Sequence, residues 1–147
     1  TGSQELLDRM QKGSSVERNA QFIHDAHAAG LSIRCTMFKG FPGETAMDME
    51  ATERFLEKHG HMLDRVRFNN FSLYTDTPVW REMIGKSGAG AELELTASDH
   101  ARAQFRYRRL KPFGRDYRRS KARVLSIVHE INRRPLRDSA RQFDGLM

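Results

Sequence analysis

Cysteine and long apolar runs are what this sequence most clearly lacks. Cys35 is the single cysteine among 147 residues, so no disulfide can form within the chain, and a reducing compartment is expected. No apolar run approaches the roughly 20 residues that a membrane-spanning helix needs. The first residues also lack the basic segment followed by an apolar one that is typical of a signal peptide. We therefore expect a cytoplasmic protein that has no membrane partner.

Groups of metal-ligating or nucleophilic side chains are also scarce. His24 and His27 lie three residues apart on a predicted helix, but no cysteine or carboxylate clearly completes a metal site with them. His59 and His61 flank a turn glycine. Cys35 is one of the apolar residues that alternate with polar ones along a predicted strand, and it is expected to be a small buried side chain. The sequence therefore predicts no metal ligand and identifies no catalytic residue.

The net charge of +6 is concentrated in the last third of the chain. Residues 101–141 contain 14 Lys and Arg against three Asp and Glu, whereas residues 1–100 are acidic overall. One interpretation is a solvated surface, or a surface that pairs with acidic parts of a larger protein. The other is a surface for nucleic acid or an anionic substrate. We prefer the first interpretation, so a nucleic-acid partner is not expected.

Hydrophobic periodicity predicts helices and strands in alternating order. The predicted helices cover residues 4–11, 15–29, 46–59, 79–84 and 117–133, and the predicted strands cover residues 31–38 and 65–73. This order favours βα units around a parallel sheet. Residues 100–109 are ambiguous, with a strand as one option. Residues 85–99 are rich in small side chains and are expected to form a flexible linker.

Residues 31–45 are the stretch around which the rest is organised: a strand, a glycine-rich turn and the start of a helix. Thr45 is a predicted N-cap, with Asp48 placed to return the capping contact. Gly40 and Gly43 let the backbone turn sharply or approach a ligand closely. Because α/β folds bind ligands at the carboxyl ends of their strands, we expect a binding site at this turn.

Alternation also predicts which strand side chains face away from the helices. They are Arg34, Thr36 and Phe38 on the first strand, and Arg67, Asn69 and Phe71 on the second. A sheet face that only needed packing would place Val, Ile or Leu there. We therefore predict a pocket in which Arg34, Thr36 and Arg67 bind substrate. The alternative is that Arg34 or Arg67 pairs with an acidic residue of a strand outside this chain.

The residues from Phe38 to Thr45, Phe-Lys-Gly-Phe-Pro-Gly-Glu-Thr, resemble the fifth-strand motif of the radical S-adenosylmethionine (SAM) enzymes. Residues 2–13 resemble the end of the fourth strand and its following helix, and residues 64–78 resemble the sixth strand and its exit. The resemblance implies an α/β fold, namely the C-terminal fragment of a partial TIM-like (β/α)6 barrel. Residues 1–84 would form its βα units, 85–99 the linker, and 100–147 a basic, helical C-terminal extension.

The resemblance also implies a set of residues that bind SAM. These are Ser3 at the ribose, Phe38, Gly40, Phe41 and Gly43 at the adenine, and Asn69 and Phe71 at the end of the sixth strand. Phe38 stands where the family usually has Ile or Val, so that contact would be altered. The alternatives are that Ser3 is simply an N-cap and that Phe38 is ordinary packing.

Radical SAM enzymes hold a 4Fe–4S cluster on three cysteines, and this chain has only one. The resemblance therefore implies the C-terminal part of a longer oxidoreductase that acts on a small-molecule substrate. The chain's first partner would be the rest of the same polypeptide, and the fragment alone would be inactive. We also expect the fragment to self-associate as a dimer, because its predicted sheet has bare edges.

Within the superfamily, the chain most closely resembles the class with a cobalamin-binding domain. This class includes the anaerobic Mg-protoporphyrin IX monomethyl ester cyclase and implies tetrapyrrole cyclisation with cobalamin as a further cofactor. The alternative is an RNA methylthiotransferase-like enzyme, which shares the Gly-Phe-Pro-Gly-Glu-Thr turn and a following Thr-Pro, here Thr77-Pro78. Those enzymes normally continue into a small β-barrel that binds RNA, whereas this chain continues into a basic helix, which argues against them. A second alternative, independent of the resemblance, is a basic nucleic-acid-binding module with no enzymatic activity.

Overall fold

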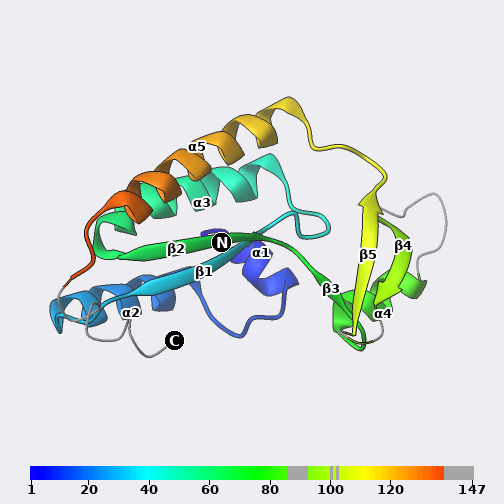
Figure 1. Cartoon of the computed structure of the whole chain (residues 1–147), viewed down its shortest axis with the longest axis horizontal. Coiled ribbons are helices and arrows are strands. Elements are labelled where there is room, and N and C mark those ends of the chain that lie inside the picture. Colours follow the sequence, from blue (N-terminus) through cyan, green and yellow to red (C-terminus); the bar gives the residue numbers. More distant parts are fainter. Residues whose placement is uncertain (86–92, 100, 102, 138–147) are drawn as a thin grey trace.

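The computed structural model describes residues 1–85, 93–99, 101 and 103–137, and it shows a mixed α/β protein with two small sheets (Figure 1). The helices are α1 (Gln4–Arg9), α2 (Val16–Ala28), α3 (Ala46–His59), the short 3-10 helix η1 (Gly60–Met62), α4 (Pro78–Gly85) and α5 (Arg115–Arg133). The strands are β1 (Arg34–Lys39), β2 (Arg65–Asn70), β3 (Leu73–Tyr74), β4 (Leu93–Asp99) and β5 (Gln104–Arg109). Among these residues, no helix is long and apolar enough to cross a membrane.

The first sheet is a parallel pair of β1 and β2, as the alternation of helices and strands predicted. Met37 of β1 and Val66 of β2 are buried on the face that meets the helices. Side chains of α2, α3 and α5 complete that core: Ile23, Ala26, Met49, Phe55, Leu56, Tyr117, Val124, Val128 and Ile131. The apolar stripes of these helices therefore face the sheet, and one core joins residues from both ends of the described chain.

Local capping explains where the first helices begin. Thr45 accepts a hydrogen bond from the backbone N–H of Asp48, and Asp48 accepts one from the backbone N–H of Thr45, so α3 starts with the predicted capping box. The bounds of α3 are those predicted. Ser15 caps α2 by accepting from the backbone N–H of Arg18, so α2 begins one residue after its predicted start. Ser3 caps α1 in the same way.

The first strand is shorter than predicted, because its expected start closes the preceding helix. The backbone N–H of Leu31 donates to the carbonyl of Ala26, so Leu31 cannot pair in the sheet, and it is 57% exposed. The backbone N–H of Ile33 donates to the carboxylate of Asp64. Pairing of β1 with β2 begins only at Arg34.

The second predicted strand is divided between two sheets. β2 ends at Asn70, the backbone N–H of Phe71 donates to the carbonyl of Lys39, and the chain then enters β3. β3 pairs with β5, which pairs with β4, in an antiparallel sheet of order β3-β5-β4. The sequence did not predict this sheet.

Residues 93–99, expected in the flexible linker, form β4. The remainder of that predicted linker, apart from Gly85, lies in residues 86–92, outside the described part of the chain. The ambiguous segment 104–109 is the strand β5. α4 begins at Pro78, close to its predicted start, and its Trp80 ring stacks on Phe105 of β5 with ring centroids 6.0 Å apart.

The basic helix α5 runs beside α3 (Figure 1). Its apolar stripe joins the same core as α3, so α5 does not cover the opposite face of the β1–β2 pair. At its end, the side-chain amide of Asn132 accepts from the backbone N–H of Val66 at 2.8 Å and donates to the Val66 carbonyl at 2.9 Å. Asn132 therefore satisfies backbone groups on one edge of β2, an edge that we had predicted to be bare.

Candidate ligand-binding loop and strand face

The loop from Gly40 to Thr45 joins the carboxyl end of β1 to α3. Gly40 has φ of +82° and Gly43 has φ of +75°, in the left-handed region that favours glycine. The backbone N–H of Glu44 donates to the carbonyl of Phe41 at 3.0 Å, which closes the turn. The predicted glycine-rich turn is therefore present, and both glycines are required by backbone conformation.

Glu44 is the buried carboxylate at the centre of this loop. Its Oε2 accepts hydrogen bonds from the backbone N–H of Gly40 and, at 2.8 Å, from the hydroxyl of Tyr117 in α5. Burial raises the pKa of Glu44, and the hydrogen bonds from Tyr117 and Gly40 oppose that shift. Burial, followed by the neighbouring Glu44 charge, likewise raises the pKa of Tyr117, so the hydroxyl keeps its proton.

Arg109 reaches the same loop from the end of β5. Its Nη2 donates to the carbonyl of Gly40 at 3.0 Å and to that of Phe41 at 3.4 Å. The guanidinium carbon lies 4.0 Å from the ring centre of Phe113. Phe113 in turn stacks on Tyr117, with ring centroids 3.7 Å apart and planes 7° apart. The connection between β5 and α5 therefore holds the loop through several contacts.

The two glycines of the loop differ in what surrounds them. A Cβ added to Gly43 would lie 2.6 Å from Nη1 of Arg9, and the same nitrogen donates to the Gly43 carbonyl at 2.6 Å. Arg9 of α1, rather than a ligand, thus makes the close approach predicted at Gly43. A Cβ added to Gly40 would meet no atom within 4 Å. Of the two glycines, only Gly40 therefore has open space where a side chain would be.

Ser3 is buried and its hydroxyl is used inside the protein. It donates to Asp48 Oδ1 and accepts from the backbone N–H of Leu6. Asp48 also accepts from Arg9 Nη2 at 2.9 Å. Burial alone would raise the pKa of Asp48, but the hydrogen bonds from Ser3 and Thr45 and the Arg9 charge lower it. The structure thus supports the N-cap alternative for Ser3.

The opposite face of the β1–β2 pair brings together five of the predicted site residues. Thr36 pairs in register with Arg67, and Phe38 pairs with Asn69. All four side chains are exposed, as is Arg34 two residues earlier on β1. Phe38 is 36% exposed, and the ammonium of Lys12 lies 5.5 Å from its ring centre. The predicted alternation on this face is therefore confirmed for Arg34, Thr36, Phe38, Arg67 and Asn69.

Phe41 and Phe71 are less exposed than these five residues. Phe41 is buried, and its ring centroid is 5.0 Å from that of Phe71. Phe71 also packs near Tyr107 of β5, at 6.2 Å between centroids. Phe71 is half-buried beside these two rings, and is therefore less open than Phe38, although its backbone N–H still donates to the carbonyl of Lys39 on β1.

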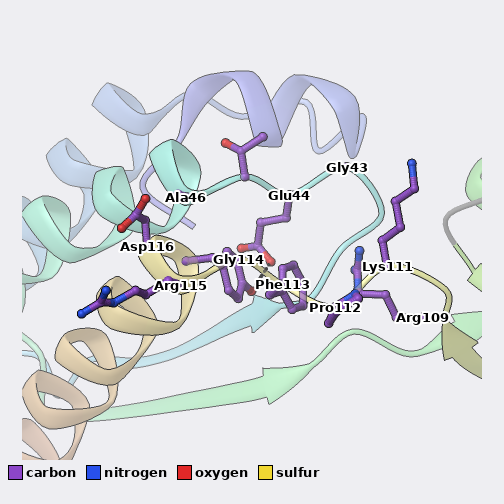
Figure 2. Close-up of a pocket in the computed structure, with 12 residues that line it drawn as sticks. Gly43, Glu44, Ala46, Arg109, Lys111, Pro112, Phe113, Gly114, Arg115 and Asp116 are labelled. Atoms are coloured by element: carbon purple, nitrogen blue, oxygen red, sulfur yellow. Dashed lines mark hydrogen bonds between the residues drawn. The ribbon is translucent and has the colours of Figure 1, made fainter.

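Two pockets adjoin the loop and the strand face. One, of about 460 Å³, lies between the loop and the connection from β5 to α5, where Glu44, Arg109, Phe113 and Tyr117 line it (Figure 2). The other, of about 390 Å³, lies along β1. It is lined there by Arg34, Cys35, Thr36 and Phe38, with residues of α1 and α2 on its other side. The predicted substrate and adenine residues of β1 therefore share one hollow.

The most constrained contacts of the loop were not predicted. Glu44 stood in the recognised motif, but its partner Tyr117 lies 73 residues away, and Arg109 lies 69 residues from Gly40. Arg9 is 34 residues from Gly43. Separations of this size leave no periodic signal in the sequence. The one available signal was an aromatic residue, Tyr117, on the apolar stripe of a strongly basic helix.

The chain does not itself fit an iron–sulfur cluster. It has one cysteine, Cys35, and burial raises the pKa of its thiol, which disfavours the thiolate that ligates metals. In the part of the chain that the structure describes, no three His, Cys, Asp or Glu side chains are arranged to hold a metal ion. The histidines instead form ring contacts, His24 with His59 and His27 with His61.

Comparison with known proteins gives partial matches. The ribosomal protein uS12 methylthiotransferase RimO of Flavobacterium psychrophilum is 34% identical over 58 residues, which are 38% of this chain and 13% of that protein. The enzymes of the same name from Roseiflexus sp. and Roseiflexus castenholzii are 35% and 36% identical over 77 residues, 51% of this chain and 16% of theirs. The match thus spans less than a fifth of the length of these relatives.

These relatives are methylthiotransferases of the radical SAM superfamily. The similarity supports that superfamily for the matched part of the chain, and it gives no support to the Mg-protoporphyrin cyclase class. No family model and no solved structure matches the chain.

Proposed function

We propose that this chain is part of a radical SAM enzyme of the methylthiotransferase type, and that it supplies one wall of the SAM site. The observation that carries the proposal is the partial identity to three methylthiotransferases, together with a Gly-Phe-Pro-Gly-Glu-Thr turn at the carboxyl end of a parallel strand. In the proposed enzyme, β1 and β2 are neighbouring strands of the partial barrel, and their exposed face points to its interior.

The proposed SAM contacts follow from exposure. Phe38 offers an aromatic ring at the carboxyl end of β1, with Asn69 beside it in register on β2. Gly40 offers a backbone with no side chain and no protein atom at its open side. Arg34, Thr36 and Arg67 continue along the same face and are the proposed substrate contacts. Phe41, Phe71, Gly43 and Ser3 support the loop from inside and are proposed to act indirectly.

The cyclase class, with its cobalamin, was the leading expectation from the sequence, but the relatives give it no support, so the methylthiotransferase type is preferred. One feature had argued against that type: the chain continues into a basic helix and not into a small β-barrel. In the structure the continuation is β4, β5 and α5, and several of its arginines bind this chain's own groups. Arg123 pairs with Glu53, and Arg137 pairs with Asp64. Those contacts give the basic segment a structural role and lower the support for a nucleic-acid-binding module.

Binding of the iron–sulfur cluster and enzymatic activity would be tested in the complete polypeptide that contains this chain. The reading frame upstream of Thr1 should encode a three-cysteine loop, because this chain cannot ligate the cluster itself. After anaerobic reconstitution, and with dithionite as the electron donor, SAM should be cleaved to methionine and 5′-deoxyadenosine. Incubation with ribosomal protein uS12, the reductant, SAM as the methyl source and sulfide as the sulfur source should replace one C–H hydrogen by a methylthio group, detected by mass spectrometry. A reading frame without that cysteine loop would overturn the proposal.

SAM binding gives a test at the level of single residues. Phe38→Ala should weaken SAM binding about tenfold, since stacking of a base on an aromatic ring contributes about 1–3 kcal/mol. Tyr74→Ala is the matched control, because Tyr74 is an exposed aromatic on β3, outside both pockets. Equal SAM affinity of the Phe38→Ala variant and the parent would show that Phe38 does not contact the adenine.

A further inference from the structure

Both backbone polar groups of Gly40 are linked to residues 109–117, its carbonyl directly through Arg109 and its N–H through Glu44. Its N–H donates to Glu44, whose carboxylate is fixed by Tyr117, and its carbonyl accepts from Arg109. Arg109 packs on Phe113, and Phe113 stacks on Tyr117. These contacts form a closed circuit that starts and ends at Gly40; we call Arg109, Phe113, Tyr117 and Glu44 the loop bracket.

We propose that Arg109 and Tyr117 are positioning residues that set the backbone of Gly40 and Phe41 for the bound nucleoside of SAM. This inference rests on the proposed function and names residues outside the motif that resembles the family. Neither residue lies on the exposed strand face, so neither is proposed to contact the ligand. They act through the loop, whose open side at Gly40 has room for an atom of the ligand.

The chemistry of the loop bracket explains why these residue types are required. Glu44 is buried, so without the hydroxyl of Tyr117 its carboxylate would lose one of its two hydrogen bonds on Oε2. A guanidinium is planar, so Arg109 can stack on Phe113 and still donate to two carbonyls, which the ammonium of a lysine cannot reproduce. A pre-formed loop costs less entropy when a ligand binds, so loss of the loop bracket should lower affinity.

The pocket beside the loop bracket makes the loop sensitive to single contacts. About 460 Å³ of open space lies between the loop and parts of residues 109–117, so on that side few packed side chains join the two segments (Figure 2). The polar contacts of Arg109 and Tyr117 cross that space at its edge. Removing one of them should therefore change the loop without removing a core side chain.

Two measurements test this inference, the first on the complete polypeptide that contains this chain, with its cluster reconstituted, and the second on this chain. In the first, the affinity for SAM is measured by calorimetry for Tyr117→Phe and Arg109→Lys. Each variant is expected to bind SAM about tenfold more weakly. Tyr117→Phe loses the hydrogen bond to the Glu44 carboxylate, and Arg109→Lys loses the contact of one guanidinium with two carbonyls. Tyr74→Phe and Arg108→Lys are the matched controls, expected to bind as the parent does. Glu44→Ala should lose about tenfold or more, and Glu44→Gln, which keeps an acceptor oxygen, should restore affinity to within about twofold of the parent.

The second measurement does not need SAM. In the labelled chain, the amide proton resonance of Gly40 should move as Glu44 titrates, because that carboxylate is its acceptor. The movement should disappear in Glu44→Gln, and Tyr117→Phe should shift its midpoint. A Gly40 resonance that is independent of pH, or variants that bind SAM like the parent, would overturn the inference and leave the proposed function intact. If the parent protein binds no SAM while the Gly40 amide resonance still moves with pH, the loop bracket is formed but the proposed role of the loop in SAM binding is overturned.

Discussion

The two sheets of this protein differ in how they are held in place. The parallel pair β1–β2 has one face in a core built from three helices, and Met37 and Val66 are almost fully buried there. In the antiparallel sheet β3-β5-β4, Leu73 and Leu93 are buried, while Leu95 is 40% exposed and Glu94 pairs with Arg108 in solvent. The comparison shows that the parallel pair depends on apolar burial, whereas the antiparallel sheet depends on backbone pairing and a few ring contacts.

The largest expected difference between the two sheets is the response to loss of a buried leucine. Leu56→Ala, in the core behind the parallel pair, should lower the free energy of unfolding by about 3–5 kcal/mol, because well-packed surroundings cannot collapse into the cavity. Leu93→Ala, in the antiparallel sheet, should cost about 2 kcal/mol or less, since Leu93 lies outside the main core cluster. Urea unfolding of both variants measures this. Equal costs would mean that the two sheets share one packed core.

A second effect should come from Arg134, which lies just after α5. Its guanidinium donates to the carbonyls of Gly60, His61 and Leu63, which connect α3 to β2. Arg134→Ala should cost about 1.5–3 kcal/mol, as expected for hydrogen bonds to a charged group. Arg133→Ala is the matched control on the neighbouring exposed residue, with an expected change within about 0.5 kcal/mol. If both variants unfold at the same urea concentration, the end of α5 does not stabilise the parallel pair.

A carboxylate near each sheet should differ in how much it stabilises the protein and in how that contribution depends on pH. The pKa of Asp48 is lowered in the folded protein, so the unfolded chain binds the proton more readily. The ionised Asp48 therefore stabilises the fold above pH 3.8, and this contribution to the free energy of unfolding is lost as the pH falls below that value. Asp48→Asn should therefore cost about 1–2 kcal/mol at pH 7 and progressively less at lower pH. In the antiparallel sheet, Glu94→Gln should cost within about 0.5 kcal/mol at pH 7, because its ion pair is exposed. Thermal unfolding of both variants from pH 7 to pH 2.5 would show whether the two differ.

The smallest expected effect concerns the edge of the parallel pair. Asn132→Ala should cost about 1 kcal/mol, because the backbone N–H and carbonyl of Val66 lose their partners. It should also strengthen the dimerisation that we propose for this chain, because more of the sheet edge becomes available for pairing. Asn70→Ala, at the exposed end of β2, is the control. Light scattering over a range of concentrations measures the effect, and a variant that stays monomeric would show that this edge does not drive association.

The elements of the parallel pair could be predicted because their signals are local. Alternation along Cys35–Phe38 and a capping box at Thr45 depend on neighbours within a few residues, and both were confirmed. The antiparallel sheet could not, since β3 has only two residues and pairs with a strand about 30 positions later. The same reason hid Arg109 and Tyr117, whose partners are fixed only by the completed fold. Phe38 and Phe41 stand in the same motif, which does not indicate that Phe38 is exposed and Phe41 is buried; only the structure distinguishes them.

The contacts at the end of α5 also set an order of events during synthesis. Asn132 and Arg134 bind groups that lie 66 to 74 residues earlier in the chain. On the ribosome, α3 and β2 therefore emerge well before the residues that complete their surroundings. Until then, the apolar side of the parallel pair remains accessible to chaperones and to other nascent chains.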